Sequence, residues 1–583
     1  MANSPCSFPS FGISEIYRSY NSFTGYEKQE SFSKRKQEEL SGIENLGGTH
    51  SFCSEYGFYQ ENNPTGKRVN FATDIEPSFP EFAPSPPIYG PGILSGFEFD
   101  PTFLSTNQSL SEILGEEEEQ SSFSVVSLQL LTNSASGIEK LKGEIRSDYE
   151  INYAGGQKLS TEEIMRVAGE RFIQLSTQRV DDSSSMHIHP YGYAFSGLSF
   201  EDTQDVELVH LLLAAAEKVG YQQFASASRL LTSCEWLSSA TGNPVRRVVS
   251  YFAGALRERI DRETGRFTSW KMEGNENYSM AGSGTRVSSN LALLKFHQEL
   301  PFSQVMLFPG IQAILENIKS DTKIHLVDLR IRSGVQWVIL MQALTERVLH
   351  PIENLKITAV GTTGGENMEE TGKRLANFAR SLNFPFSFNV VLLSDMKDLT
   401  TEHFNTEDGE AVVIYSQTIL PSMISRPNCL ENLMGVIRRL NPAIMVVIEV
   451  EANHNSPSFF NRFIEALFFY SALFDCLEEF GNQDDLYRIT LEGKFFGDGI
   501  HNIVAAEGEE RVNRNVKMSV WRAFFARFGM VGAELSESAL YQANLIVKQF
   551  AFGSNCTLEN DGKCLTVGWK GTPIHSLSTW KFL

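Results

Sequence analysis

The amino-acid sequence predicts an α/β protein with a doubly wound sheet, a helical region before that sheet and a long disordered segment before both. Three observations predict this order. Short, nearly continuous apolar runs alternate with helical patterns from Ile324 onward, as in a parallel sheet covered on both faces. Apolar residues recur at helical spacing across residues 205–260. Residues 1–155 show no sustained periodicity.

Residues 1–155 are predicted to form a disordered regulatory arm. Serine, glycine, proline, phenylalanine and acidic residues dominate it, and this composition buries too little apolar surface to offset the entropy of ordering. Apolar residues at 110–114 precede an acidic run at 116–119. That pattern is typical of segments that fold on a partner, and equally of a solvated linker. The basic run at 34–36 is a short candidate for a nuclear import signal.

Residues 156–203 are predicted to form a capping helix and a linker. Ser160 and Glu163 have the spacing of a capping box, and Leu159 with Ile164 forms a hydrophobic staple across it. Apolar residues continue at helical spacing, and a polar segment rich in serine and histidine follows.

The next region is helical, and one of its patterns has two interpretations. Leu208, Leu211 and Leu212 lie on one face of its first predicted helix. They also fit L-x-x-L-L, a pattern by which helices dock in a partner's groove. Leucines at this spacing are equally what a buried helix needs. We favour a position in the core and keep the three leucines as interaction candidates.

Five strands of a parallel sheet are predicted after the helical region, with helices between them. These strands are residues 324–328, 355–360, 388–392, 412–415 and 443–448. Ser456 and Pro457 are predicted to be the N-cap and the first residue of a strongly aromatic helix. Residues 565–569 and 574–580 are predicted to form an antiparallel hairpin at one edge of the sheet.

Composition and charge exclude several classes of protein. A hydrophobic content of 42% in 583 residues supports a large core. A formal net charge of −21 repels phosphate backbones, so strong DNA binding would need a concentrated basic face. The seven cysteines form no C-x-x-C pair, which argues against a zinc site and a disulfide framework. No secretory signal or membrane-spanning run is evident, so we expect a soluble, intracellular protein without a bound metal.

The loop after the first strand lacks the residues of a nucleotide site. In a loop that binds a nucleotide or S-adenosylmethionine, glycines follow the acid at the second, fourth and sixth positions. Here Arg330 and Arg332 take the first two of these positions after Asp328, and Gly334 takes the third. The second strand ends without an acid for a ribose hydroxyl. We therefore expect no cofactor and no enzymatic activity, with the arginines paired to neighbouring acids.

Four polar residues follow the fifth strand: Glu449, Glu451, His454 and Asn455. A histidine near carboxylates is the usual material of general-base and metal sites. No second histidine stands at ligand spacing, and no G-x-S-x-G motif is evident. Capping of loops and hydrogen bonding to backbone are therefore the favoured roles, with catalysis as the alternative.

Several blocks of the chain resemble the GRAS family of plant transcriptional regulators. The sequence Ile-His-Leu-Val-Asp at 324–328 resembles the VHIID motif, and residues 450–455 resemble a stretch of the PFYRE block. Trp521 begins a W-x7-G spacing, and Trp569 and Trp580 form a W-x10-W spacing. The motif residues that we take as interaction candidates are Ile324, His325, Leu326, Val327, Asp328, Leu208, Leu211, Leu212, Trp521, Trp569 and Trp580.

The resemblance implies a methyltransferase-like (Rossmann-type) sheet with an α-helical cap, within a GRAS-like domain at 204–583. The implied regions are leucine-rich region I (206–260), the VHIID region (279–345), leucine-rich region II (364–398), the PFYRE region (405–503) and the SAW region (506–583). Residues 329–334 and the capping helix suggest the subgroup named Required for Arbuscule Development, which serves mycorrhizal symbiosis. The arm lacks the D-E-L-L-A motif, so a true DELLA protein is not expected. Residues 511–516 lack acids that the family usually carries, so an ion-pair network there does not follow from the resemblance.

The sequence and the resemblance together predict a nuclear transcriptional co-regulator, with the cytoplasm as a second location. It would act as a protein–protein interaction scaffold in plant developmental or symbiotic signalling. Its expected partners are other GRAS proteins and DNA-binding transcription factors, in homo- or heterodimers, with DNA contacted mainly through them and no membrane partner. One alternative is a direct, sequence-specific DNA-binding factor, and another is a methyltransferase-like protein that binds a small molecule. In the DNA-binding alternative, the candidate phosphate contacts are Arg330, Arg332, Arg511, Arg514 and Lys517.

Overall fold

The structure is a computed structural model, and it describes residues 159–178, 198–266, 300–480 and 485–583. All of these residues belong to one compact unit of the chain. The predicted arm, with its acidic and basic runs, lies outside the described residues, as do most of the predicted linker and the beginning of the VHIID region.

The described residues form a nine-stranded sheet, and its parallel half has the doubly wound order that the sequence predicts. The strand order is β3-β2-β1-β4-β5-β9-β8-β7, and β6 pairs with the end of β9. The first five strands are parallel, and β9 joins β5 in the antiparallel direction. The strands are β1 (Lys323–Asp328), β2 (Asn354–Gly361), β3 (Phe386–Leu392), β4 (Ala411–Gln417), β5 (Ile444–Val450), β6 (Met530–Ala533), β7 (Cys556–Asn560), β8 (Cys564–Trp569) and β9 (Thr572–Phe582).

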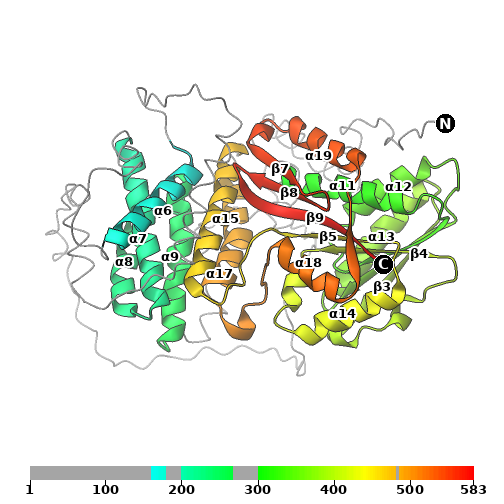
Figure 1. The fold of residues 1–583 in the computed structure, drawn as a ribbon, viewed down its shortest axis with the longest axis horizontal. Helices are drawn as coiled ribbons and strands as arrows, with labels where there is room; N and C mark the ends of the chain where they lie inside the picture. The colour runs from blue at the N-terminus through cyan, green and yellow to red at the C-terminus, as the bar shows by residue number, and fades with distance from the viewer. Residues whose placement is uncertain (1–158, 179–197, 267–299, 481–484) are drawn as a thin grey trace, which may run out of the picture. The chain divides into compact units, whose positions relative to one another are not determined.

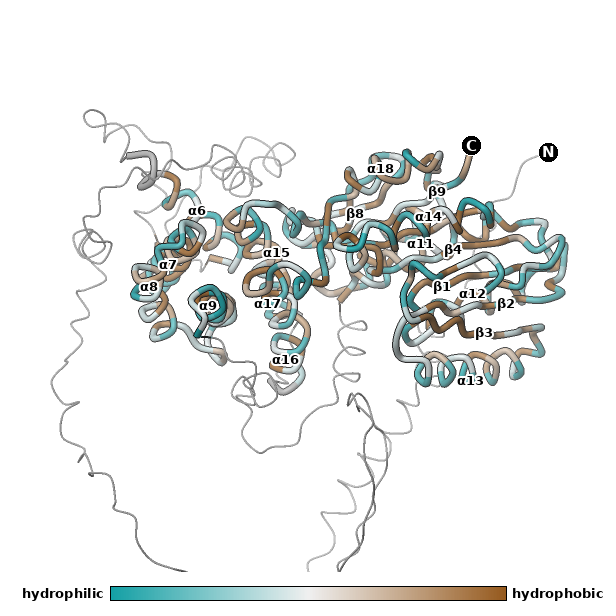
Figure 2. The backbone as a smooth tube through the Cα atoms, turned by 90° about the horizontal axis from the view of Figure 1, so that it is seen from below, coloured by the Kyte–Doolittle hydropathy of each residue, from teal (hydrophilic) through white to brown (hydrophobic). Residues whose placement is uncertain are grey.

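The central strands are buried on both faces, so helices must cover both. β1, β4 and β5 are buried at nearly every position, and Figure 2 shows a long hydrophobic stretch along β4. Parallel strands of this kind need a layer on each side. One hydrophobic core contains residues of α11 (Pro301–Asn317), α12 (Val335–Thr345), α13 (Gly365–Ser381) and α19 (Glu537–Gln549), and the other contains residues of α14 (Pro427–Leu440) and α18 (Met518–Arg527). The predicted α/β class is therefore confirmed (Figure 1).

A group of helices forms the cap. It consists of α6 (Thr161–Gln178), α7 (Phe200–Gly220), α8 (Phe224–Leu237), α9 (Pro244–Glu263), α15 (Phe459–Phe480) and α17 (Asp498–Val504), with α16 (Asp485–Leu491) and a π-helical turn (Glu492–Gly497) leading into α17. α15 contacts α6 and α9 of the cap and also β8 and β9 of the sheet. None of the described helices is both long enough and apolar enough to cross a membrane.

The capping box at the start of α6 is confirmed. The backbone N–H of Ser160 donates to Glu163 Oε2 (2.8 Å), and the backbone N–H of Glu163 donates to Ser160 Oγ (3.3 Å). These two bonds satisfy donors that a helix start leaves open.

The predicted C-terminal hairpin forms, but its predicted position at the edge of the sheet is wrong. β8 and β9 pair in the antiparallel direction, yet β9 lies between β5 and β8, and β7 is the edge strand. β9 is 11 residues long and largely buried, so it needs partners on both sides. Neither β6 nor β7 was predicted, because strands of four and five residues carry little periodicity.

The predicted start of the aromatic helix is also wrong. α15 begins at Phe459, two residues beyond Pro457. Its capping residue is Ser458, whose Oγ accepts a hydrogen bond from the backbone N–H three residues on (3.4 Å). The carbonyls of Ser456 and Pro457 instead accept hydrogen bonds from Arg462 Nη1 (2.9 and 3.3 Å), so both residues precede the helix.

Trp580→Ala should lower the free energy of unfolding by roughly 3–5 kcal/mol. The Trp580 side chain is buried, its ring centroid lies 4.8 Å from that of Phe525, and its Nε1 donates to Ser578 Oγ (2.8 Å). Its removal would leave a cavity beneath α18. Urea denaturation of the purified chain measures the change, and Trp236→Ala, at an exposed tryptophan of α8, is the matched control. Equal denaturation midpoints for the two variants would contradict a core role for Trp580.

Candidate functional site

The carboxyl ends of β1 and β4 meet where the strand order reverses, which is where doubly wound sheets bind their ligands. β1 ends at Asp328, and the chain turns through Gly334 into α12. Gly334 has a φ of 72°, and a Cβ there would lie 2.9 Å from Thr371 Cγ2, so the turn requires glycine. Asp328 accepts hydrogen bonds from Trp337 Nε1 (2.9 Å) and Gln336 Nε2 (3.3 Å). Burial raises the pKa of this carboxyl to about 6, and its contacts fasten the loop to α12.

Arg330 and Arg332 extend from this loop to the end of β4. Arg330 Nη1 donates to the carbonyl oxygen of Thr418 (2.8 Å), and Arg332 Nη2 donates to Thr418 Oγ1 (2.7 Å). Thr418 directly follows β4 and has a φ of 52°. Thr418 was not predicted as a partner, because the sequence favoured neighbouring acids. The two residues that replace glycines thus connect the strands on either side of the reversal point.

Two carboxylates lie at the end of β5: Glu449, on the strand, is buried, and Glu451, just after it, is half-buried. The Oε1 of Glu449 accepts a hydrogen bond from the backbone N–H of Leu420 (3.4 Å), and burial raises the pKa of Glu449 well above its usual value. Glu451 accepts from the backbone N–H of Met518 at the start of α18 (3.0 Å to Oε2), and burial raises its pKa too. Glu451 therefore holds the start of α18.

His454 is enclosed by protein. Its ring stacks on Tyr470 at 6.3 Å and meets Phe469 edge-on at 5.2 Å between centroids. Its Nδ1 lies 3.2 Å from Asn515 Nδ2. Burial lowers the pKa of His454 to about 3, so the imidazole is neutral near pH 7. In the described ranges, His, Cys, Asp and Glu side chains nowhere gather in a group of three that could hold a metal ion.

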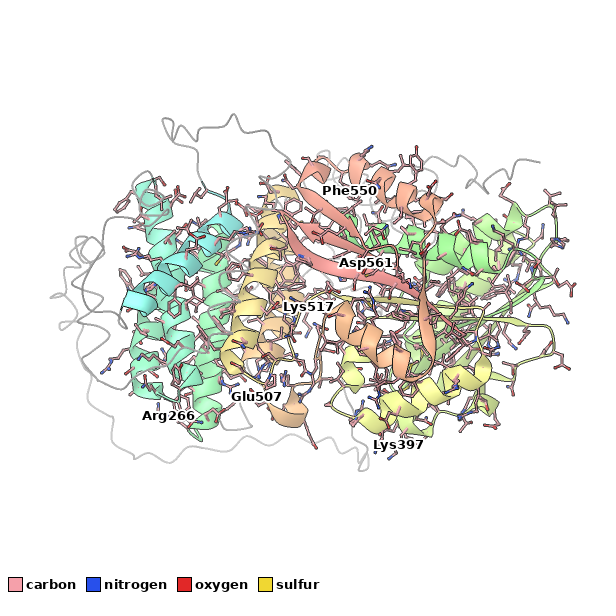
Figure 3. All side chains as sticks on the ribbon, viewed as in Figure 1. Arg266, Lys397, Glu507, Lys517, Phe550 and Asp561 are labelled. Atoms are coloured by element: carbon pink, nitrogen blue, oxygen red, sulfur yellow. The ribbon has the colours of Figure 1, made fainter. Side chains whose placement is uncertain are left out.

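The other candidate phosphate contacts lie in two separate places. Arg511 and Arg514 each donate from Nη1 to Asn455 Oδ1 (3.4 Å). Lys517 Nζ lies 3.4 Å from a carboxylate oxygen of Glu465 on α15, and Lys517 is labelled in Figure 3. The five candidate cations are therefore divided among three locations.

The motif residues that were taken as interaction candidates are buried. Each is at most 5% exposed: Ile324, His325, Leu326, Val327, Asp328, Leu208, Leu211, Leu212, Trp521, Trp569 and Trp580. Their contacts build the interiors of the cap and the sheet.

His325 links β1 to β2 and to the residue before β4. Its Nε2 lies 2.8 Å from Thr358 Oγ1, and its Nδ1 lies 3.3 Å from a Glu410 oxygen. Lys356 Nζ lies 2.7 Å from Glu410 as well. Burial and then the charge of Lys356 lower the pKa of His325 to about 4. Sequence reasoning missed Lys356 and Glu410, although a lysine within an apolar strand was an available signal.

Asp475 is a further residue that sequence reasoning missed. It accepts hydrogen bonds from Trp569 Nε1 (2.7 Å) and the backbone N–H of Thr161 (3.1 Å), and it lies 2.7 Å from Lys570 Nζ. An acid within an otherwise apolar stretch of α15 was the signal. Through this carboxylate, α15 binds both the start of α6 and the turn between β8 and β9.

The sequence pattern that defines the GRAS domain family matches residues 208–581. This range includes all the residues described above at the carboxyl ends of the parallel strands. The chain belongs to the GRAS family. DELLA protein GAI1 of Vitis vinifera is 30% identical over 390 residues, and DELLA protein RGA of Arabidopsis thaliana is 31% identical over 390 residues. Each alignment covers 65% of this chain and 63% of the relative, so this GRAS chain spans less than two thirds of the length of these relatives.

A solved GRAS-type structure shares the fold. The crystal structure of SCL7 in Oryza sativa is 26% identical, with a TM-score of 0.56, and the match covers 64% of this GRAS chain and 99% of that one. The family resemblance inferred from the motifs is therefore confirmed, and the symbiotic subgroup stays a prediction. α6 precedes the matched residues, yet its first residues are bound to α15 and to β9.

His454→Asn should reduce the pH dependence of stability. The pKa of His454 is about 3 in the folded chain against an ordinary value of 6.5, so the unfolded chain takes up a proton first as the pH falls. The stability due to the neutral ring is present above pH 6.5 and is lost progressively toward pH 3. Between pH 7 and pH 5, the unfolding free energy of the unsubstituted chain should fall by about 2 kcal/mol more than that of the variant. Equal losses in urea denaturation at the two pH values would mean that His454 titrates normally.

Proposed function

We propose that this GRAS chain is a nuclear transcriptional co-regulator that acts as a protein–protein interaction scaffold in plant developmental or symbiotic signalling. The observation that carries the proposal is the bridge from Arg330 and Arg332 to Thr418. The protein's own side chains stand where an enzyme with such a sheet would bind its cofactor. A sheet with its own arginine side chains at the ligand position supports a role in which the chain binds other proteins.

The proposed partners are other GRAS proteins and DNA-binding transcription factors, in homo- or heterodimers. We propose that DNA is reached mainly through them. A net charge of −21 supports this indirect route, because it repels the phosphate backbone. One candidate phosphate contact, Lys517, also has a partner within the protein, since it faces Glu465.

Exposed aromatic side chains on the cap supply the surface that we propose for partner binding. Phe200 at the start of α7 is 74% exposed, and Trp236 near the end of α8 is 66% exposed. Tryptophan is a frequent hot spot of protein interfaces, which supports this surface.

Trp236→Ala should weaken binding of a partner transcription factor by about tenfold or more, with an unchanged melting temperature. The reason is that the exposed ring packs on the partner. Co-precipitation from nuclei and promoter occupancy measured on the same samples should fall together. Tyr541→Ala, at an exposed aromatic of α19, is the matched control and should retain both.

Direct DNA recognition would give the opposite result. The purified chain alone would then bind a specific promoter fragment at nanomolar concentration and physiological salt. Arg330, Arg332 and Arg514 would be the first residues to substitute, and the scaffold role would be rejected.

A further inference from the structure

Three arginines from separate segments surround one carboxylate, that of Glu507. Arg259 of α9 has its Nη1 2.9 Å from Glu507 Oε1. Arg462 of α15 donates from Nη2 to the same oxygen. Arg511, on the loop between α17 and α18, has its Nε 3.7 Å from Glu507 Oε2. Glu507 is labelled in Figure 3 beside the helices of the cap.

The arginines around Glu507 carry more positive charge than their contacting carboxylates balance. Arg514 lies on the same loop and donates from Nε to the carbonyl of Arg511 (3.2 Å). Glu263, 3.2 Å from Arg259 Nη2, is a second carboxylate in contact with the group. Burial, followed by the charges of two neighbouring arginines, lowers the pKa of Arg511 to about 10. Two carboxylates thus face four guanidinium groups.

Two buried donors in this cluster lack an acceptor. Arg462 is 2% exposed and Arg511 is 5% exposed, and the Nε–H of each has no hydrogen-bond acceptor among the described residues. A buried donor left without an acceptor costs about 1–3 kcal/mol. An anion with several oxygens would satisfy such donors better than a carboxylate with two.

Glu507 can leave while the arginines stay. Its side chain is 40% exposed, so it can rotate into water. Arg462 is anchored by the carbonyl of Ser456 (2.9 Å) and Arg511 by the carbonyl of His454 (3.0 Å). The guanidinium groups therefore keep their places when the carboxylate moves away.

We propose that the cluster of Arg259, Arg462, Arg511 and Arg514 binds a phosphate monoester dianion in place of the Glu507 carboxylate. Such a group carries up to two negative charges and three acceptor oxygens, and guanidinium forks match its geometry. While no phosphate is bound, the Glu507 carboxylate takes its place and balances part of the positive charge of the arginines. Because the arginines come from α9, α15 and the loop before α18, a bound phosphate joins these three segments.

Glu507→Gln tests the substitute role, since it removes the competing charge and keeps the side-chain shape. Without phosphate, the melting temperature of the variant should fall, because three guanidinium groups lose a counter-charge. Inorganic phosphate should restore it and should bind the variant about tenfold more tightly than the unsubstituted chain. Chloride at matched ionic strength is the control. If phosphate stabilises the variant no more than chloride does, the proposal is overturned.

A matched pair of variants tests the site in a chain that keeps Glu507. Arg514→Gln should weaken inorganic phosphate binding by about tenfold or more in calorimetric titration of the full chain. Lys517→Gln removes the same charge three residues away, where the lysine faces Glu465, and should leave binding unchanged. If both variants lose the same phosphate affinity, binding depends only on the overall positive charge of this region, and the proposed site is overturned.

Two further probes separate the sources of the phosphate group. The first probe is a phosphoserine peptide. If it displaces inorganic phosphate and its unphosphorylated form does not, the site is supported and the phosphate group comes from a phosphorylated protein. Binding of inorganic phosphate without the peptide supports the site with a free phosphate compound as its source. The second probe is a double-stranded oligonucleotide. If it binds the chain through Arg514, and neither inorganic phosphate nor the phosphoserine peptide binds, the monoester proposal is overturned in favour of nucleic-acid contact.

Discussion

The burial of α15 on two sides is the constraint on which the described structure depends. The helix is rich in phenylalanine and leucine around its circumference, as a helix without a large exposed face requires. Phe463 meets Phe252 of α9 edge-on at 5.3 Å, whereas Asp475 binds Trp569 of β8. A buried carboxylate is tolerated when several donors satisfy it, and Asp475 has such donors from three elements. The cap and the sheet therefore share one helix, and a change in α15 acts on both.

The residues that follow β1 and β4 at the carboxyl end of the parallel strands make many contacts with one another and with α12. Asp328, which stands where a nucleotide-binding loop begins, bonds instead to Trp337 of α12. Arg330 and Arg332 tie β1 to the residue after β4. Charged groups in this position are stable because each finds a hydrogen-bond partner a few ångströms away. The two arginines that stand at glycine positions of a nucleotide-binding loop thus stabilise the reversal point of the sheet.

Local patterns predicted much of the fold, and contacts between distant residues account for most of what they missed. The five parallel strands and the capping box of α6 were predicted because continuous apolar runs and a four-residue motif are visible within one segment. The place of β9 inside the sheet was not, since strand order depends on pairing between segments far apart in sequence. The start of α15 was missed because Ser456 and Ser458 are both good caps, and Arg462 decides between them. Glu410, a partner of His325, and Arg259, a partner of Glu507, likewise lie far away along the chain.

The position of β9 has a consequence for how the chain is made. A ribosome releases β5 long before β9, and β8 cannot join the sheet until β9 lies between them. The first residue of β9 also completes the attachment of α6, because Thr572 Oγ1 donates to Glu162 Oε1 (2.7 Å) across 410 positions of sequence. Closing so long a loop is slow, and the unpaired edge of β5 is prone to aggregation in the meantime. In a nascent chain of this protein, β5 therefore keeps an unpaired edge, and α6 lacks this attachment, until β9 has been made.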